Sequence, residues 1–134
     1  MLKKMLVLLF VLGIANVCFA ENTLYSLDES DGYIYCANHQ ELIWYIVEDS
    51  LEVDSEDDML VIYADIVSLN TRDGKTHIYP KKFVYDEENN KMYFCNKKGT
   101  LRQLVYRGYW AGTGRHYYMA NKAYYIVNGE YFDE

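Results

Sequence analysis

Apolar and polar residues alternate with a period of two along most of the chain after residue 32, which is typical of half-buried β-strands. The strongest example is residues 59–69. One face of this run collects a set of small and branched apolar side chains: Leu60, Ile62, Ala64 and Ile66. We therefore predict that this face points into the core.

Shorter strand patterns flank the central run, at residues 33–37, 42–47, 76–86, 91–96 and 100–106. Turn residues such as Asp73-Gly74 separate them. Pro80 has no N–H, which places that point of its strand at an edge, a bulge or a strand start. Strand runs joined by tight turns pair with their neighbours. The pattern therefore predicts an antiparallel meander.

Two polar stretches interrupt the meander. Residues 49–53 are interpreted as a short strand extension, and residues 54–58 (DSEDD) as an acidic turn. Clustered carboxylates also suit calcium. However, Met59 stands where an EF-hand loop needs glycine, so a solvated turn is the preferred interpretation.

The period changes near the C-terminus. Residues 107–116 (RGYWAGTGRH) contain three glycines and are predicted to be a loop. Residues 117–127 place their apolar side chains on one helical stripe, and Asn128-Gly129 is a helix stop, although the tyrosines also suit a strand. The predicted fold class is α+β, mostly β: an antiparallel meander sheet of about six strands with a C-terminal helix.

The first twenty residues (MLKKMLVLLFVLGIANVCFA) predict a cleaved secretory signal peptide. Lys3 and Lys4 precede an apolar run too short for a membrane anchor, and Ala20 offers a small residue at the cleavage point. An uncleaved anchor and lipidation of Cys18 are the alternatives. We expect residues 1–20 to be removed, residues 21–32 to form a loose lead-in, and residues 33–134 to form one domain. Export places this domain in the periplasm or outside the cell, with no stable membrane span after cleavage.

Charge narrows the class of partner. Loss of Lys3 and Lys4 with the signal peptide changes the formal net charge from −7 to −9. Such a chain repels nucleic acid and anionic lipid, so neither is an expected partner. All 15 tyrosines follow the signal peptide, many of them in strand-like runs, and most are expected to be structural.

Two cysteines remain after cleavage, Cys36 and Cys95. In an oxidising compartment this number predicts one disulfide. It would close a loop of about 60 residues and add roughly 4 kcal/mol on the chain-entropy model. Two buried free thiols are the alternative.

One segment has the composition of a binding site. Arg107, Trp110, Arg115 and His116 concentrate cationic and aromatic side chains in an otherwise acidic chain. Arginine and tryptophan are common in interface hot spots, and glycines let backbone amides approach an anion. We therefore predict a ligand- or partner-binding loop here, although Trp110 packed over the sheet is the simpler alternative.

No catalytic, metal or cofactor motif is evident. His39, His77 and His116 have no zinc-ligand spacing, and no G-x-S-x-G sequence occurs. The expected function is therefore a secreted or envelope-associated, non-enzymatic binding domain. The alternatives are a small extracytoplasmic enzyme or inhibitor using residues 107–116, and a purely structural envelope protein.

Three stretches carry a resemblance: YIYCANHQELIWYIVEDSLEV, MLVIYADIVSL and KKFVYDEENNKMYFCNKKG. They are similar to small secreted bacterial proteins of unassigned function, and AYYIVNGEYF resembles the aromatic helix that ends those chains. More distantly, the chain resembles surface-adhesin protein E-like domains, with Asp49-Ser50 as the shared turn. That resemblance implies binding of host or envelope partners. The chain lacks that family's C-terminal Cys and its Pro-Gly-Ser turn, so no adhesive residue is carried over.

Overall fold

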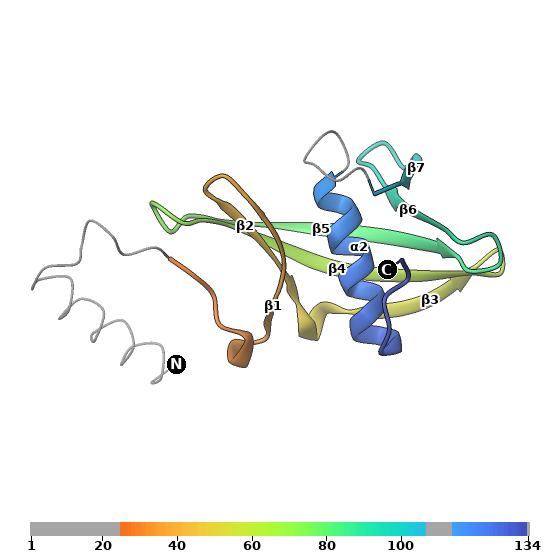
Figure 1. The fold of residues 1–134 in the computed structure, drawn as a ribbon, viewed down its shortest axis with the longest axis horizontal. Coiled ribbons are helices and arrows are strands. Elements are labelled where there is room, and N and C mark those ends of the chain that lie inside the picture. Colours follow the sequence, from red (N-terminus) through yellow and green to blue (C-terminus); the bar gives the residue numbers. More distant parts are fainter. Residues whose placement is uncertain (1–24, 107–113, 134) are drawn as a thin grey trace, which may run out of the picture.

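The computed structural model describes residues 25–106 and 114–133, which form one antiparallel sheet with a helix across it (Figure 1). The predicted fold class is confirmed, with seven strands in the sheet. The strands are β1 (Tyr33–His39), β2 (Leu42–Val47), β3 (Glu52–Glu56), β4 (Met59–Asn70), β5 (Thr76–Asp86), β6 (Lys91–Cys95) and β7 (Leu101–Leu104). The other elements are the 3-10 helices η2 (Glu29–Asp31) and η3 (Glu48–Ser50) and the α-helix α2 (Gly114–Asn128). The predicted signal peptide lies outside the described residues.

The sheet order is β1-β2-β4-β5-β6-β7, and β3 pairs with β4 beside β2. β4 is long enough to take two partners along one edge. β2 pairs with its second half, from Ile66 to Asn70, and β3 with its first half, from Met59 to Tyr63. The segment that joins β2 to β3 therefore passes from the second half of β4 to its first half along the same edge of that strand.

Ser50, at the end of η3, holds this connection against β4 through hydrogen bonds. Its hydroxyl accepts a hydrogen bond from the Asp65 N–H at 2.8 Å and donates one to the Val47 carbonyl at 2.6 Å. Without the serine, the Asp65 N–H would lose this partner in the gap between β2 and β3. A local side-chain bond therefore replaces one rung of the ladder.

The core lies between the sheet and α2. Ile62, Ile66, Phe83 and Tyr85 have no exposed surface, which confirms the predicted core face of β4. The helix contributes a stripe at helical spacing: His116, Tyr117, Met119, Ala120, Ala123 and Tyr124. Because two of these residues are alanines, the helix backbone can approach the sheet closely.

The opposite face of the sheet is also partly covered. Tyr45 is 4% exposed there, and its hydroxyl accepts a hydrogen bond from the Leu27 N–H at 3.2 Å. The Tyr25 N–H bonds to the Thr71 carbonyl at 3.0 Å. The part of the lead-in that the structure describes is therefore attached to the back of the sheet.

Around β3 the structure differs from the sequence prediction in two ways. β3 occupies most of the predicted acidic turn, and only Asp57 and Asp58 turn, with positive φ of 50° and 65°. Asp tolerates this conformation, and two such residues match the twist of a tight hairpin. Of the predicted strand extension at residues 49–53, residues 49 and 50 lie in η3, whereas residues 52 and 53 begin β3. The prediction missed the extent of β3 because all of its side chains are exposed, so the strand has no alternation of apolar and polar residues.

The C-terminal helix is confirmed, but it begins at Gly114, three residues before the predicted start. It ends as predicted, because Gly129 adopts a φ of 80° and its N–H bonds to the Tyr125 carbonyl at 2.8 Å. Pro80 lies on a free edge, since the β5–β6 pairing covers only residues 83–86 of β5. Its missing N–H therefore costs no hydrogen bond within the described sheet.

The predicted disulfide between Cys36 and Cys95 is wrong, because both are free thiols. Cys36 lies on β1 and Cys95 on β6, with β2, β4 and β5 between them in the sheet. Strands are spaced by about 4.8 Å, so the two backbones are roughly 19 Å apart along the sheet. A disulfide needs Cα atoms within about 7 Å.

Candidate functional site

The predicted binding segment is divided by the structure. Arg107 and Trp110 lie outside the described residues, whereas Arg115 and His116 lie in the first turn of α2 instead of a loop. The guanidinium carbon of Arg115 lies 5.7 Å from the centre of the Trp44 ring. Arg115 is exposed and its position on the helix is fixed, so it can contact a ligand.

His116 is buried in this turn. Its ring stacks on Phe94, with centroids 4.1 Å apart and planes 11° apart. Only 6% of its surface is exposed, and neither ring nitrogen has a hydrogen-bond partner among the described residues. Burial, followed by repulsion from Lys81 and Arg115, lowers the pKa of His116 to about 3. The imidazole is therefore neutral at physiological pH.

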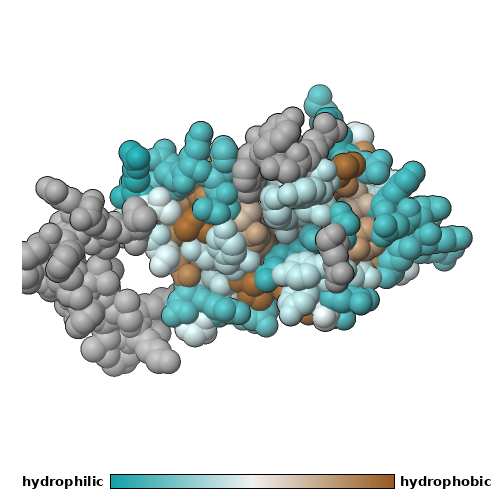
Figure 2. Space-filling view, in the orientation of Figure 1, coloured by the Kyte–Doolittle hydropathy of each residue, from teal (hydrophilic) through white to brown (hydrophobic). Residues whose placement is uncertain are grey.

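A second candidate site lies beside the middle of α2. A hollow of about 350 Å³ lies between β1, α2 and the C-terminal tail. We name it the tyrosine groove, after the three tyrosines among its lining residues: Tyr35, Cys36, Tyr118, Asn121, Lys122, Tyr131 and Asp133. Figure 2 shows weakly polar and apolar surface along the middle of this face, with strongly hydrophilic residues towards both ends.

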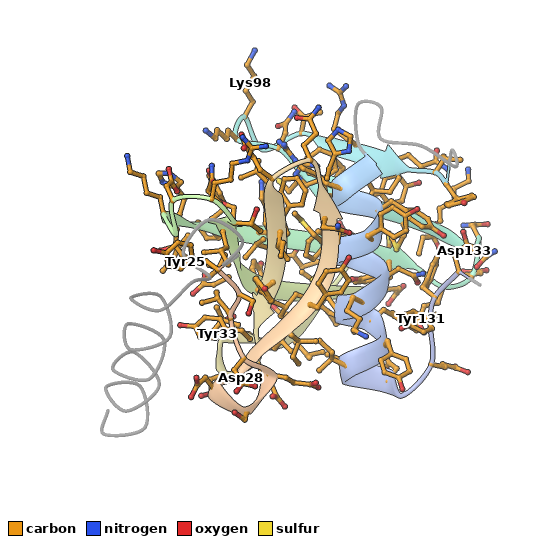
Figure 3. All side chains as sticks on the ribbon, turned by 60° about the vertical axis from the view of Figure 1, so that its left-hand side comes forward. Tyr25, Asp28, Tyr33, Lys98, Tyr131 and Asp133 are labelled. Atoms are coloured by element: carbon orange, nitrogen blue, oxygen red, sulfur yellow. The ribbon has the colours of Figure 1, made fainter. Side chains whose placement is uncertain are left out.

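Hydrogen bonds hold the tail that forms one wall of the groove. The Asn121 amide donates to the Asp133 carbonyl at 2.7 Å, and the Asp133 N–H donates to the Asn121 side-chain oxygen at 3.0 Å. The Tyr117 hydroxyl donates to the Asp133 carboxylate at 2.7 Å. Figure 3 shows Tyr131 and Asp133 on the tail that returns beside α2. The C-terminal residues are thereby fixed against the helix.

The same tail positions an aromatic stack. Tyr131 stacks on Tyr125, with centroids 4.5 Å apart and planes 20° apart. The Lys122 ammonium lies 5.2 Å from the Tyr125 centroid and 5.8 Å from that of Tyr131. Both tyrosines remain 40% exposed, and Tyr35 across the groove is 50% exposed. The rings are therefore held in place while their surfaces stay available.

The groove contains a thiol, but one of low reactivity. Cys36 is the extra residue of a β-bulge between Tyr35 and Ala37, and its thiol donates to the Ile34 carbonyl at 3.6 Å. Burial raises the pKa of Cys36 to about 12. Since the thiolate is the nucleophilic form, this cysteine is a poor candidate for covalent catalysis.

Sequence reasoning missed the tyrosine groove. Its residues come from β1, α2 and the tail, about a hundred positions apart, and no local motif joins them. One signal was available in the sequence: Tyr125 and Tyr131 flank Gly129. Their rings can come into contact only if the chain reverses its direction at that glycine.

The described residues contain no group of three or more His, Cys, Asp or Glu side chains that could hold a metal ion. In the same part of the chain, no helix has the length and apolar character needed to cross a membrane. Comparison with family models, with curated proteins and with solved structures gave no match. The geometry of the site is therefore the basis for inferring a function.

Proposed function

We propose that the chain is an exported, non-enzymatic binding domain that contacts a protein or envelope component through the tyrosine groove. The observation that carries the proposal is the set of exposed rings at Tyr35 and Tyr131, which line the groove, and at Tyr125, which stacks on Tyr131 beside it. Tyrosine provides a large rigid contact area with a polar tip, and it is enriched at protein interfaces. The resemblance to surface-adhesin protein E-like domains favours the same class of function.

Preorganisation supports this proposal. Ordering a flexible segment on binding costs free energy, and a surface that is already ordered avoids that cost. Asn121 and Tyr117 fasten the tail through Asp133 before any partner arrives. Rings needed only for folding would be buried more completely, as Tyr85 is at 0% exposure.

The alternatives use other parts of the chain. An enzyme or inhibitor acting through residues 107–116 would depend on Arg115 and His116, and a structural protein would self-associate. The groove proposal requires neither, so Arg115→Gln should leave groove contacts intact. Sedimentation at increasing protein concentration separates the structural alternative from the other two.

Site-specific photocrosslinking in the producing cells tests the proposal. A photoreactive phenylalanine analogue replaces Tyr131 in the groove or, as a control, Val53 on β3, which is 55% exposed. We expect a discrete adduct from position 131 and none from position 53. Equal adducts from both positions, or none from position 131, would contradict the proposal.

A further inference from the structure

Charge is strongly segregated along the chain. Fourteen of the 20 acidic residues lie within residues 21–73, together with a single cation, Arg72. Residues 89–129 contain no acidic residue but carry seven lysines and arginines. In Figure 3, side-chain nitrogen atoms gather at the end marked by Lys98, and oxygen atoms at the end marked by Asp28. The net charge of the chain therefore conceals a basic region.

Four cations from four parts of the fold meet in this region, which we name the basic corner: Lys81, Lys97, Arg102 and Arg115. Lys81 on β5 lies within electrostatic reach of both Arg115 and Lys97. Arg102 on β7 is the cross-strand neighbour of Phe94, on which His116 stacks. Cross-strand neighbours share a face, so Arg102 lies on the side of the sheet that carries α2.

The basic corner lacks counter-charges within the described residues. Among residues 25–106 and 114–133, the ion pairs are Arg72–Glu41 and Lys82–Glu56, and neither pair includes a residue of the basic corner. Lys81 is partly buried, and burial together with its cationic neighbours lowers its pKa. His116 is buried beside it, and neither of its ring nitrogens has a partner among residues 25–106 and 114–133. Several cations close together with no ion-pair partner among the described residues create a local positive potential that attracts an anion.

An aromatic row leads to the corner. His77, Tyr79 and Lys81 alternate along β5 and so share one face of the strand. The rings of His77 and Tyr79 are 6.4 Å apart, and the Lys81 ammonium is 5.7 Å from the Tyr79 centroid. Among the described strands, none pairs with this outer side of β5, so a ligand can lie along about 13 Å of exposed strand.

We propose that the basic corner and the aromatic row bind an anionic polysaccharide. Its phosphate or sulfate esters lie against Lys81, Lys97, Arg102 and Arg115, and its sugar rings stack on His77 and Tyr79. A thin chain can touch this edge alone. A membrane plane or a long nucleic acid would also approach the acidic part of a molecule whose net charge after cleavage is −9, and would be repelled. The proposal relies on the proposed function only for export to where such polymers occur.

Immobilised heparin, a sulfated polysaccharide, is the probe. The purified protein is eluted with a salt gradient, and two double variants are compared with it. Arg102→Gln/Arg115→Gln removes two exposed corner charges, and Arg72→Gln/Lys91→Gln removes two exposed charges elsewhere. We expect the corner variant to bind at least about tenfold more weakly and to lose roughly two units of salt slope, while the control stays close to wild type. Circular dichroism checks that each variant is folded.

Tyr79→Ala tests the contribution of ring stacking separately from that of charge, because it removes an aromatic surface and no charge. We expect weaker heparin binding with an unchanged salt slope. Vesicles containing an anionic phospholipid form the second arm, and we expect no binding to them. Failure to bind heparin, equal elution of the two double variants, no effect of Tyr79→Ala, or binding to vesicles in place of heparin would each overturn the proposal. None of these outcomes bears on photocrosslinking at the groove.

Discussion

The buried tyrosines of the core differ from the exposed tyrosines of the groove in how their hydroxyls are used. Tyr85 donates to the Ala120 carbonyl at 2.6 Å, and Tyr124 donates to the Glu87 carboxylate at 2.7 Å. Burial raises the pKa of both, that of Tyr124 to about 12. Tyr131 instead stacks on Tyr125 at the surface, where its hydroxyl accepts a solvent-exposed hydrogen bond from the Lys122 ammonium at 3.4 Å. One residue type therefore supplies both a satisfied core and a contact surface.

The difference indicates how each set is constrained. A buried tyrosine needs an acceptor or donor within reach, since an unpaired buried hydroxyl costs about 1–3 kcal/mol. A groove tyrosine needs only a neighbour that holds its ring. Substitutions should consequently affect stability at core positions and contact at groove positions.

The largest expected effect is at Tyr85. Tyr85→Ala removes a fully buried ring and should lower the free energy of unfolding by about 3–5 kcal/mol. Tyr85→Phe keeps the ring and removes only the bond to Ala120, so it should cost about 1 kcal/mol. Urea denaturation of both variants measures the difference. Equal losses would mean that ring packing does not dominate in the core.

His116 is a buried polar ring with no hydrogen-bond partner in the described part of the chain, and it should make stability depend on pH. The unfolded imidazole binds a proton below about pH 6.5. The folded one does so only below its pKa of about 3. Between these values the unfolded state holds more protons, so stability falls as pH falls, by at most about 1.4 kcal/mol per pH unit.

His116→Phe should remove this dependence while keeping the stack on Phe94. Denaturant unfolding of both proteins between pH 7 and pH 4 measures the difference, because the carboxylates common to the two chains cancel. A difference in stability that does not change with pH would contradict the assignment of His116 as a neutral buried ring.

A smaller effect is expected from the hydrogen bonds of the Ser50 hydroxyl. Ser50→Ala leaves the Asp65 N–H without its hydroxyl partner and should cost about 1–3 kcal/mol. Ser55→Ala on the exposed strand β3 is the matched control and should cost less than about 0.5 kcal/mol. Equal costs in thermal or urea unfolding would show that the Ser50 hydroxyl does not stabilise the connection between β2 and β4.

The thiols should give the smallest effect. The protein, purified without reductant and unfolded in denaturant, should expose both Cys36 and Cys95 to a thiol reagent. In the folded Cys95→Ser variant, Cys36 should react slowly at pH 8 because its pKa is raised to about 12. A mass 2 Da lower than that of the free dithiol would show that Cys36 and Cys95 form a disulfide after all.

Local patterns predicted most of the fold, because alternation and turn residues act over a few positions. Local sequence alone was enough to predict the core face from Leu60 to Ile66, the edge position of Pro80 and the helix end at Gly129. β3 was missed because an exposed strand of acidic residues has no apolar face to reveal it. The tyrosine groove was missed because Tyr35 and Tyr131 meet only through tertiary packing. The disulfide prediction failed because counting cysteines ignores the three strands between Cys36 and Cys95.

The most direct test of the groove is the yield of crosslinked adduct from a photoreactive residue at position 35, with and without Tyr125→Ala/Tyr131→Ala. The account predicts that the double substitution reduces the adduct at least about tenfold, as expected for hot-spot residues, while the urea midpoint stays near that of the parent. An undiminished adduct would contradict a binding role for these rings. A lost adduct together with a collapsed urea midpoint would show that the tyrosines stabilise the fold.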